Sequence, residues 1–242
     1  MKNVKTNFRM MACLIVASFL VLSCNKDNNS SASSEPISDD DVSTSITEAV
    51  VPSSGGMVAQ TNEAVVIVNT SSLDMNCGDT KDTAISFSGS TGDSVSYSYN
   101  LNVTSTLNCN NGIPQSFYMS FDGSNSYTSP RISSTDSASG SWNVTGIQAS
   151  SSSYVFNETY KRSGTQASKI RYDRSISSTI SITTSDLTLN KSTGKIVSGT
   201  ATVSYSGTAG SNSLSRGGTL TFLGSDEAKL VLDDGNSYVI VW

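Results

Sequence analysis

The sequence predicts a mainly β protein, an antiparallel meander of about ten strands that forms a barrel or a strongly curled sheet. Three observations support this fold class. From about residue 83 onward, apolar and polar residues alternate with the period of two that is typical of strands with one buried face. Short clusters of Gly, Asn, Asp and Ser separate the alternating segments, as expected for turns. No helical pattern of about 10–15 residues lies between them, so parallel βαβ units are not expected.

The segment before the strands, residues 42–70, admits two interpretations. Five of its residues recur at the spacing of a helix, and they follow Ser53–Gly56, a sequence suited to starting a helix. These residues are Met57, Thr61, Ala64, Val65 and Val68. Residues 64–68 would also form an acceptable buried strand. The length of the segment and its polar stretch at 60–63 favour a short N-terminal helix.

The clearest strand has five alternating apolar residues, with Ser, Asn and Thr on its other face. They are Val95, Tyr97, Tyr99, Leu101 and Val103. A turn at Asn110–Gly112 follows, and the next apolar face contains Phe117 and Phe121. Residues 122–140 are rich in Ser, Gly and Asp and contain Pro130. We therefore predict a turn at 122–125 followed by a long loop.

The second half of the chain resumes the alternation at Trp142 and keeps it to Trp242. The apolar pairs at 180–182 and 187–189 differ in parity, which predicts a bulge or bend near Thr183–Asp186. Asp233–Asn236 is typical of a hairpin turn between the last two strands.

The first 24 residues have the features of an export signal. Lys2, Lys5 and Arg9 precede an uncharged apolar run of about 13 residues, shorter than the roughly 20 needed to cross a bilayer as a helix. The run ends in Val21-Leu22-Ser23-Cys24, which resembles the lipobox of bacterial lipoproteins. The resemblance implies cleavage before Cys24 and its acylation with lipid such as palmitate. An ordinary secretory signal, with Cys24 incidental, is the alternative.

The resemblance implies a signal peptide at 1–23. The composition and periodicity of the rest predict a disordered tether at 24–41 and a single β-rich exported domain at 42–242. The polar composition of the tether is unable to bury a core. Lys26-Asp27 behind the cysteine is similar to the surface-export signal of Bacteroidetes lipoproteins. We therefore expect a lipid anchor in the cell outer membrane, with exposure at the cell surface favoured over the periplasmic face.

Charge is distributed unevenly along the chain. Residues 24–160 contain 3 basic and 14 acidic side chains, whereas residues 161–242 contain 9 basic and 6 acidic ones. Binding to nucleic acid phosphates needs clustered Lys and Arg, so the acidic balance argues against a nucleic acid partner.

Two cysteines, Cys77 and Cys109, remain in the exported domain once Cys13 is assigned to the signal and Cys24 to the lipid. In an oxidising compartment they would most simply form a disulfide. A thiolate metal site is the alternative, but the chain has no His and no third Cys to complete it. We expect no metal and no cofactor.

The absence of His also removes Ser-His-Asp and Cys-His catalysis. Hydrolysis by two carboxylates remains chemically open, and Glu158 and Asp173 flank a predicted hairpin. The favoured interpretation of both is a solvated or salt-bridged surface carboxylate.

The basic residues of the second half are concentrated between residues 161 and 174. Within this cluster, Lys169, Arg171 and Tyr172 are candidate contacts for an anion or a glycan. The alternative is a solvated strand face paired with the acidic half, where ion pairs would contribute little to stability.

Together these observations predict a non-catalytic binding or structural module, anchored to the outer membrane by lipid, with a carbohydrate or a protein as ligand. The first alternative is a carboxylate-dependent hydrolase acting on glycans. The second is a small integral outer-membrane barrel ending at Trp242, although Leu and Ile are too sparse for a lipid-facing surface.

Overall fold

The computed structural model describes residues 35–71, 74–91, 94–169 and 174–242. They belong to one compact unit that extends from Ala32 to Trp242. The predicted signal peptide, the lipidation site Cys24 and the tether up to residue 34 lie outside the described residues. No helix in the described ranges has the length and apolar character needed to cross a membrane.

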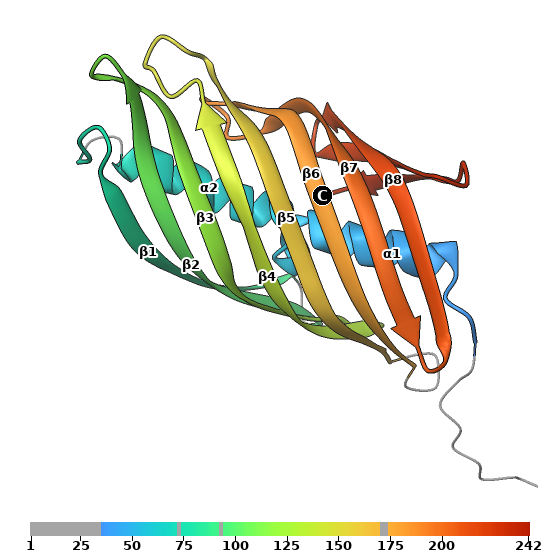
Figure 1. Ribbon diagram of the computed structural model, residues 1–242. Helices are drawn as coiled ribbons and strands as arrows, with labels where there is room; N and C mark the ends of the chain where they lie inside the picture. The colour runs from blue at the N-terminus through green and yellow to red at the C-terminus, as the bar shows by residue number, and fades with distance from the viewer. Residues whose placement is uncertain (1–34, 72–73, 92–93, 170–173) are drawn as a thin grey trace, which may run out of the picture. The chain divides into compact units, whose positions relative to one another are not determined.

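The domain is built on one antiparallel sheet of ten strands, each paired with its neighbours in the chain, so the predicted meander is confirmed. No pairing joins the first and last strands within the described residues, so the sheet is open. Figure 1 shows that it bends around two helices. The strands are β1 (Thr80–Thr91), β2 (Val95–Asn110), β3 (Ile113–Thr128), β4 (Ile132–Thr145), β5 (Ser153–Ser168), β6 (Ser175–Asn190), β7 (Ile196–Ala209), β8 (Asn212–Gly224), β9 (Glu227–Leu232) and β10 (Ser237–Val241).

The N-terminal segment is helical, as favoured, but it forms two α-helices. These are α1 (Asp39–Val50) and α2 (Met57–Ser71), separated by the short 3-10 helix η1 (Pro52–Ser54). Pro52 has no backbone N–H for an intrahelical hydrogen bond, which ends α1 nearby. Helix α1 starts at Asp39 because Ser38 and Asp41 form a capping box. Residues 39–41, which the sequence had assigned to the tether, are therefore its first turn.

The two helices lie across one face of the sheet (Figure 1). Alternate strand residues point toward them and form the core together with the buried faces of the helices. At its centre the rings of Phe121 and Trp142 stack with their centroids 4.2 Å apart, and Tyr160 adds a third ring. The opposite face of the sheet carries mostly Ser and Thr. The apolar residues at every second strand position therefore mark the face that the helices cover.

The predicted long loop at 122–140 is wrong. Strand β3 continues to Thr128 and β4 begins at Ile132, so only three residues connect them. The predicted turn at 122–125 also lies inside β3. The sequence hides these strands because their buried positions include small polar residues, among them Asn125, Ser134 and Asp136, in place of an apolar face.

The predicted bulge near Thr183–Asp186 is confirmed. Register shifts interrupt the pairing of β5 with β6 between Phe156 and Thr159, and that of β6 with β7 between Ser185 and Thr188. Asp186 has φ of 52°, in the left-handed region.

A disulfide joins Cys77 to Cys109, as predicted, with their Cα atoms 5.6 Å apart. It links the segment before β1 to the end of β2. Within the described residues β1 has a partner strand on one side only. The disulfide therefore ties the start of this edge strand to the sheet.

Replacing both Cys77 and Cys109 by Ala should lower the free energy of unfolding by about 3–4 kcal/mol, because the unfolded chain would no longer contain a closed loop. Urea unfolding of the variant and of the native chain, each with and without reductant, measures this. The reductant should shift only the native chain. Equal midpoints for native chain and variant without reductant would contradict the prediction.

Candidate functional site

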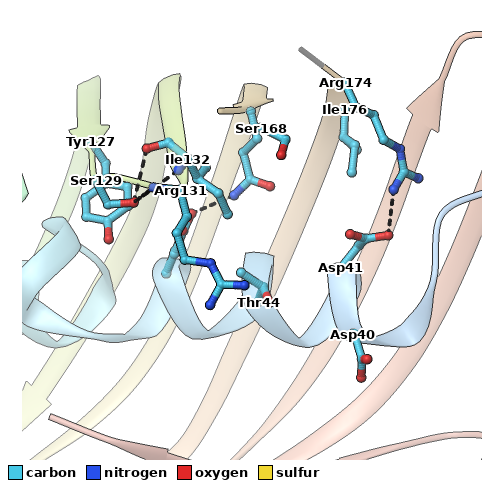
Figure 2. Close-up of a pocket in the computed structure, with 12 residues that line it drawn as sticks. Asp40, Asp41, Thr44, Tyr127, Ser129, Arg131, Ile132, Ser168, Arg174 and Ile176 are labelled. Atoms are coloured by element: carbon cyan, nitrogen blue, oxygen red, sulfur yellow. Dashed lines mark hydrogen bonds and ion pairs between the residues drawn. The ribbon is translucent and has the colours of Figure 1, made fainter. Parts of the chain in front are cut away.

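A cleft of about 370 Å³ lies between α1 and the ends of strands β3 to β6 (Figure 2). Small-molecule sites commonly occupy about 300–1,000 Å³, so this cleft suits a small ligand. The residues that line it are Asp40, Asp41, Thr44, Glu48, Tyr127, Ser129, Arg131, Ile132, Gln166, Ser168, Arg174 and Ile176.

The helix contributes one polar wall. Asp40, Thr44 and Glu48 follow one another at intervals of four residues, so they lie on the same side of α1, about 6 Å apart along its axis. Asp40 and Thr44 are exposed, whereas Glu48 is buried with 7% of its surface accessible. This wall offers carboxylate and hydroxyl groups to a ligand.

The sheet contributes the other wall. Tyr127 at the end of β3 and Ile176 at the start of β6 supply an aromatic ring and an aliphatic side chain. Between β3 and β4, a tight turn is held by Ser129, whose backbone N–H donates to Ile132 O at 2.8 Å. Arg131 extends from this turn toward α1 (Figure 2). The sheet wall therefore combines apolar surface with a positive charge.

Glu48 is held by hydrogen bonds from the sheet. Gln166 Nε2 donates to Glu48 Oε2 at 2.7 Å, and Ser45 Oγ donates to Gln166 Oε1 at 2.7 Å. Burial raises the pKa of the Glu48 carboxyl to about 7, although Arg162 and the Gln166 hydrogen bond oppose the rise. The floor of the cleft therefore contains a carboxyl group that changes its charge near neutral pH.

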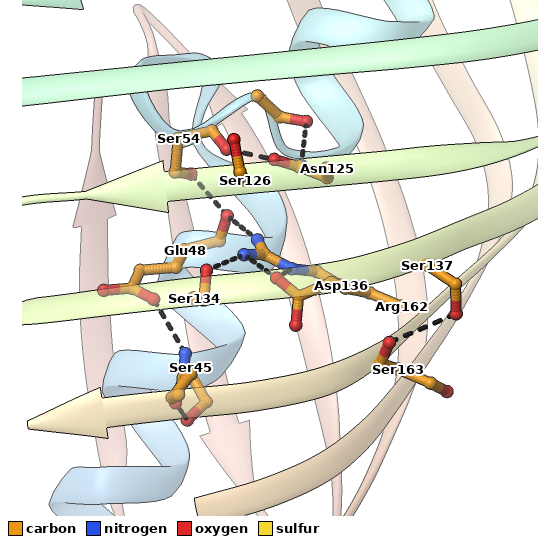
Figure 3. A network of polar contacts seen from close by, with 12 residues as sticks. Ser45, Glu48, Ser54, Asn125, Ser126, Ser134, Asp136, Ser137, Arg162 and Ser163 are labelled. Carbon is orange, nitrogen blue, oxygen red and sulfur yellow. Dashed lines mark hydrogen bonds and ion pairs between the residues drawn. The ribbon is translucent and has the colours of Figure 1, made fainter. Parts of the chain in front are cut away.

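Behind Glu48 lies a buried ion pair that joins the sheet to α1 (Figure 3). Arg162 in β5 donates through Nε and Nη2 to Asp136 Oδ2 in β4, at 2.9 and 2.6 Å. Its Nη1 donates to the backbone carbonyl of Glu48 at 2.9 Å, and its Nη2 also donates to Ser134 Oγ at 2.8 Å. This carbonyl belongs to the last turn of α1, where a positive charge is favourable.

At the other end of the cleft, Arg174 fixes the start of α1. It donates to Asp41 Oδ2 at 3.0 Å and to the Pro36 carbonyl at 2.9 Å. Burial alone would raise the pKa of Asp41, but hydrogen bonds from Ser38 and Arg174 outweigh it and hold the pKa below its usual value. Asp41 therefore serves helix capping and helix docking together.

Of the predicted anion or glycan contacts, only Lys169 can be placed. It directly follows β5, next to the turn between β3 and β4, where its Nζ donates to Ser129 O at 2.8 Å and its backbone N–H donates to Arg131 O at 2.8 Å. Arg171, Tyr172 and the predicted carboxylate Asp173 lie outside the described residues.

The surface position favoured for Glu158 is wrong. Only 1% of Glu158 is accessible, because it faces the helices from the middle of β5. Its Oε2 accepts a hydrogen bond from Thr61 Oγ1 at 3.0 Å. Burial raises its pKa to about 8, although Thr61 and the nearby Trp142 indole favour the ionised form. Within the described residues, neither Glu158 Oε1 nor Trp142 Nε1 has a partner that meets hydrogen-bond geometry.

Sequence reasoning missed most of the cleft, including Glu48, Tyr127, Arg131 and Gln166. One signal was present: a capping sequence at Ser38 followed by polar residues every four positions predicts a polar helix stripe. The described part of the chain has no cluster of three or more His, Cys, Asp or Glu residues arranged to hold a metal.

Comparison with known proteins adds no assignment: no family model, no curated protein and no solved structure matches this chain.

The two buried carboxyls should make the domain less stable as the pH rises. Folding raises the pKa of Glu48 from about 4.5 to about 7 and that of Glu158 from about 4.5 to about 8. Between pH 4.5 and these raised values, the folded state therefore binds more protons than the unfolded state does. The resulting stabilisation is complete below pH 4.5 and is lost as the pH rises through 7 and 8. Each group contributes at most about 1.4 kcal/mol per pH unit.

Urea unfolding between pH 5 and 9 measures this dependence. Glu158→Gln should flatten it and raise stability at high pH, whereas Glu35→Gln, an exposed change of the same kind, should leave it unaltered. If the unfolding free energy of the Glu158→Gln variant depended on pH as that of the native chain does, this carboxyl would not be the source of the dependence.

Proposed function

We propose that this protein is a lipid-anchored, non-catalytic binding module of the bacterial outer membrane, and that it holds a small carbohydrate in the cleft beside α1. The lipobox-like sequence ending at Cys24 supports the anchor and the location. The cleft carries the binding part of the proposal, because it combines a suitable volume with polar groups held on regular structure.

The lining of the cleft suits a sugar. Sugar rings present hydroxyl groups around their edges and C–H groups on their faces. Carboxylate, amide and hydroxyl side chains, such as Glu48, Gln166 and Thr44, pair with the hydroxyl groups. Tyr127 and Ile176 provide apolar contact for the C–H groups. A protein ligand would require a larger surface than this cleft supplies.

The arrangement of carboxylates favours binding over hydrolysis. A glycosidase needs two carboxyl groups free to act on the substrate, about 5–10 Å apart. Asp41 is engaged by Ser38 and Arg174, and Asp136 is engaged by Arg162. Burial raises the pKa of Glu48, but no second free carboxyl lies beside it in the described cleft at the spacing that a glycosidase pair needs. Release of reducing sugar during a binding experiment would contradict the non-catalytic proposal.

The anchor is tested by Cys24→Ser. Cells expressing the native chain should retain it in the outer-membrane fraction and incorporate labelled palmitate, because several acyl chains hold a protein stably at a bilayer. The variant should lose the label and leave the membrane fraction. Cys13→Ser is the matched control and should behave as the native chain. A Cys24→Ser protein that still requires detergent would point to a different mode of attachment.

The cleft is tested by filling it. Thr44→Trp places an indole on the exposed side of α1 within the cleft, so it should abolish sugar binding without disturbing the core. Saturation-transfer NMR with glucose, galactose and N-acetylglucosamine detects binding to the full chain. The matched control is Val66→Trp, since Val66 is 55% exposed on α2 and does not line the cleft. Equal signals from both variants would place any binding elsewhere.

A further inference from the structure

Arg131 differs from the other arginines that the structure describes. Arg162, Arg174 and Arg216 each form an ion pair with an aspartate. The Arg131 side chain has no hydrogen bond or ion pair within the described ranges, yet it lines the cleft. Its guanidinium therefore offers its full set of donors to a ligand.

The backbone that carries Arg131 is rigidly held. Ser129 Oγ accepts hydrogen bonds from the backbone N–H groups of Arg131 and Ile132, at 3.3 and 3.1 Å. Lys169 secures the same turn from the neighbouring strand end through its bonds to Ser129 O and Arg131 O, each 2.8 Å long. The turn is thus braced on both sides, and the arginine starts from a fixed position. Such preorganisation lowers the entropy lost when a ligand binds.

The two walls of the cleft carry opposite charges. Arg131 makes the sheet wall positive, whereas Asp40 and, in its ionised form, Glu48 make the helix wall negative. Carboxylates on the helix would accept hydrogen bonds from hydroxyl groups. A guanidinium pairs best with a carboxylate, through two parallel hydrogen bonds. A neutral ligand would leave the Arg131 guanidinium without a charged partner.

The helix wall also sets a length. Asp40 and Glu48 are eight residues apart, which is about 12 Å along the helix axis. This distance accommodates one or two sugar rings lying along α1, with one edge toward the helix and the other toward Arg131.

We propose that the ligand is a sugar acid, a mono- or disaccharide whose carboxylate is bound by Arg131 while its hydroxyl groups face Asp40, Thr44 and Glu48. This inference rests on the proposed function and narrows its ligand class. Arg131 is the specificity-determining residue, and the helix wall supplies affinity that neutral sugars share.

The test compares matched pairs of sugars on the full chain at pH 6. Glucuronate is measured against glucose, and galacturonate against galactose, by isothermal titration calorimetry. Each acid should bind at least about tenfold more tightly than its neutral partner, because a charge-assisted bidentate contact is added. On the Arg131→Gln variant each acid should bind about as tightly as its neutral partner, because the guanidinium that distinguishes the two is gone.

Lys229→Gln is the matched control. It also removes one positive charge, but Lys229 is exposed on β9 and does not line the cleft, so it should leave every affinity as it is. Equal binding of acids and neutral sugars, or an acid preference that survives Arg131→Gln, would overturn the sugar-acid assignment while leaving the carbohydrate site in place. Failure of all four sugars to bind would overturn the proposed function as well.

Discussion

The buried guanidinium of Arg162 is the constraint on which the arrangement of sheet and helices depends. A charge that is 97% removed from solvent needs compensation on every side, since breaking such a pair costs about 3–5 kcal/mol. Asp136 and Ser134 supply it from the sheet, and the Glu48 carbonyl supplies it from α1. Gly164, opposite Asp136, makes the pair sterically feasible, because a Cβ there would come within 2.3 Å of Asp136 Oδ1. The end of α1 is thus fixed over β4 and β5, and the cleft takes its shape from that position.

The uneven distribution of charge along the chain also serves to hold α1 on the sheet. Helix α1 belongs to the acidic half and docks on arginines of the basic half. Asp39 pairs with Arg216 at 2.7 Å, Asp41 pairs with Arg174 at 3.0 Å, and the Glu48 carbonyl accepts from Arg162. Three arginines of the basic half are therefore used within the domain to hold α1. Arg131 has no such structural role, because no described residue neutralises its charge.

The sequence predicted those parts of the fold that depend on local periodicity. The strands around Tyr99 and Tyr205 alternate cleanly because their buried residues are apolar, and the disulfide followed from having two cysteines. The prediction failed at β3 and β4, because their buried positions include polar residues. Asn125 is buried against the Gly55 carbonyl beside the helices, and Ser134 and Asp136 are buried against Arg162 of β5. A polar residue can be buried when it has a hydrogen-bond partner, and that partner is distant in the chain. The local sequence pattern therefore does not predict which polar residues are buried. For the same reason Glu158 was expected at the surface. The cleft was missed because its walls come from α1 and from strand ends that only the folded sheet brings together.

Glu48 links the stability of the domain to the charge of its cleft. Its carboxyl lies at the joint between α1 and the sheet, and its pKa of about 7 means that both charge states are populated near neutral pH. A negative ligand beside it favours the protonated form, so binding of a sugar acid and uptake of a proton at Glu48 would reinforce each other. The protonated form is also the one that burial favours. Burial and a bound sugar acid therefore favour the same protonation state of this residue, and one helix can both close the core and face a ligand.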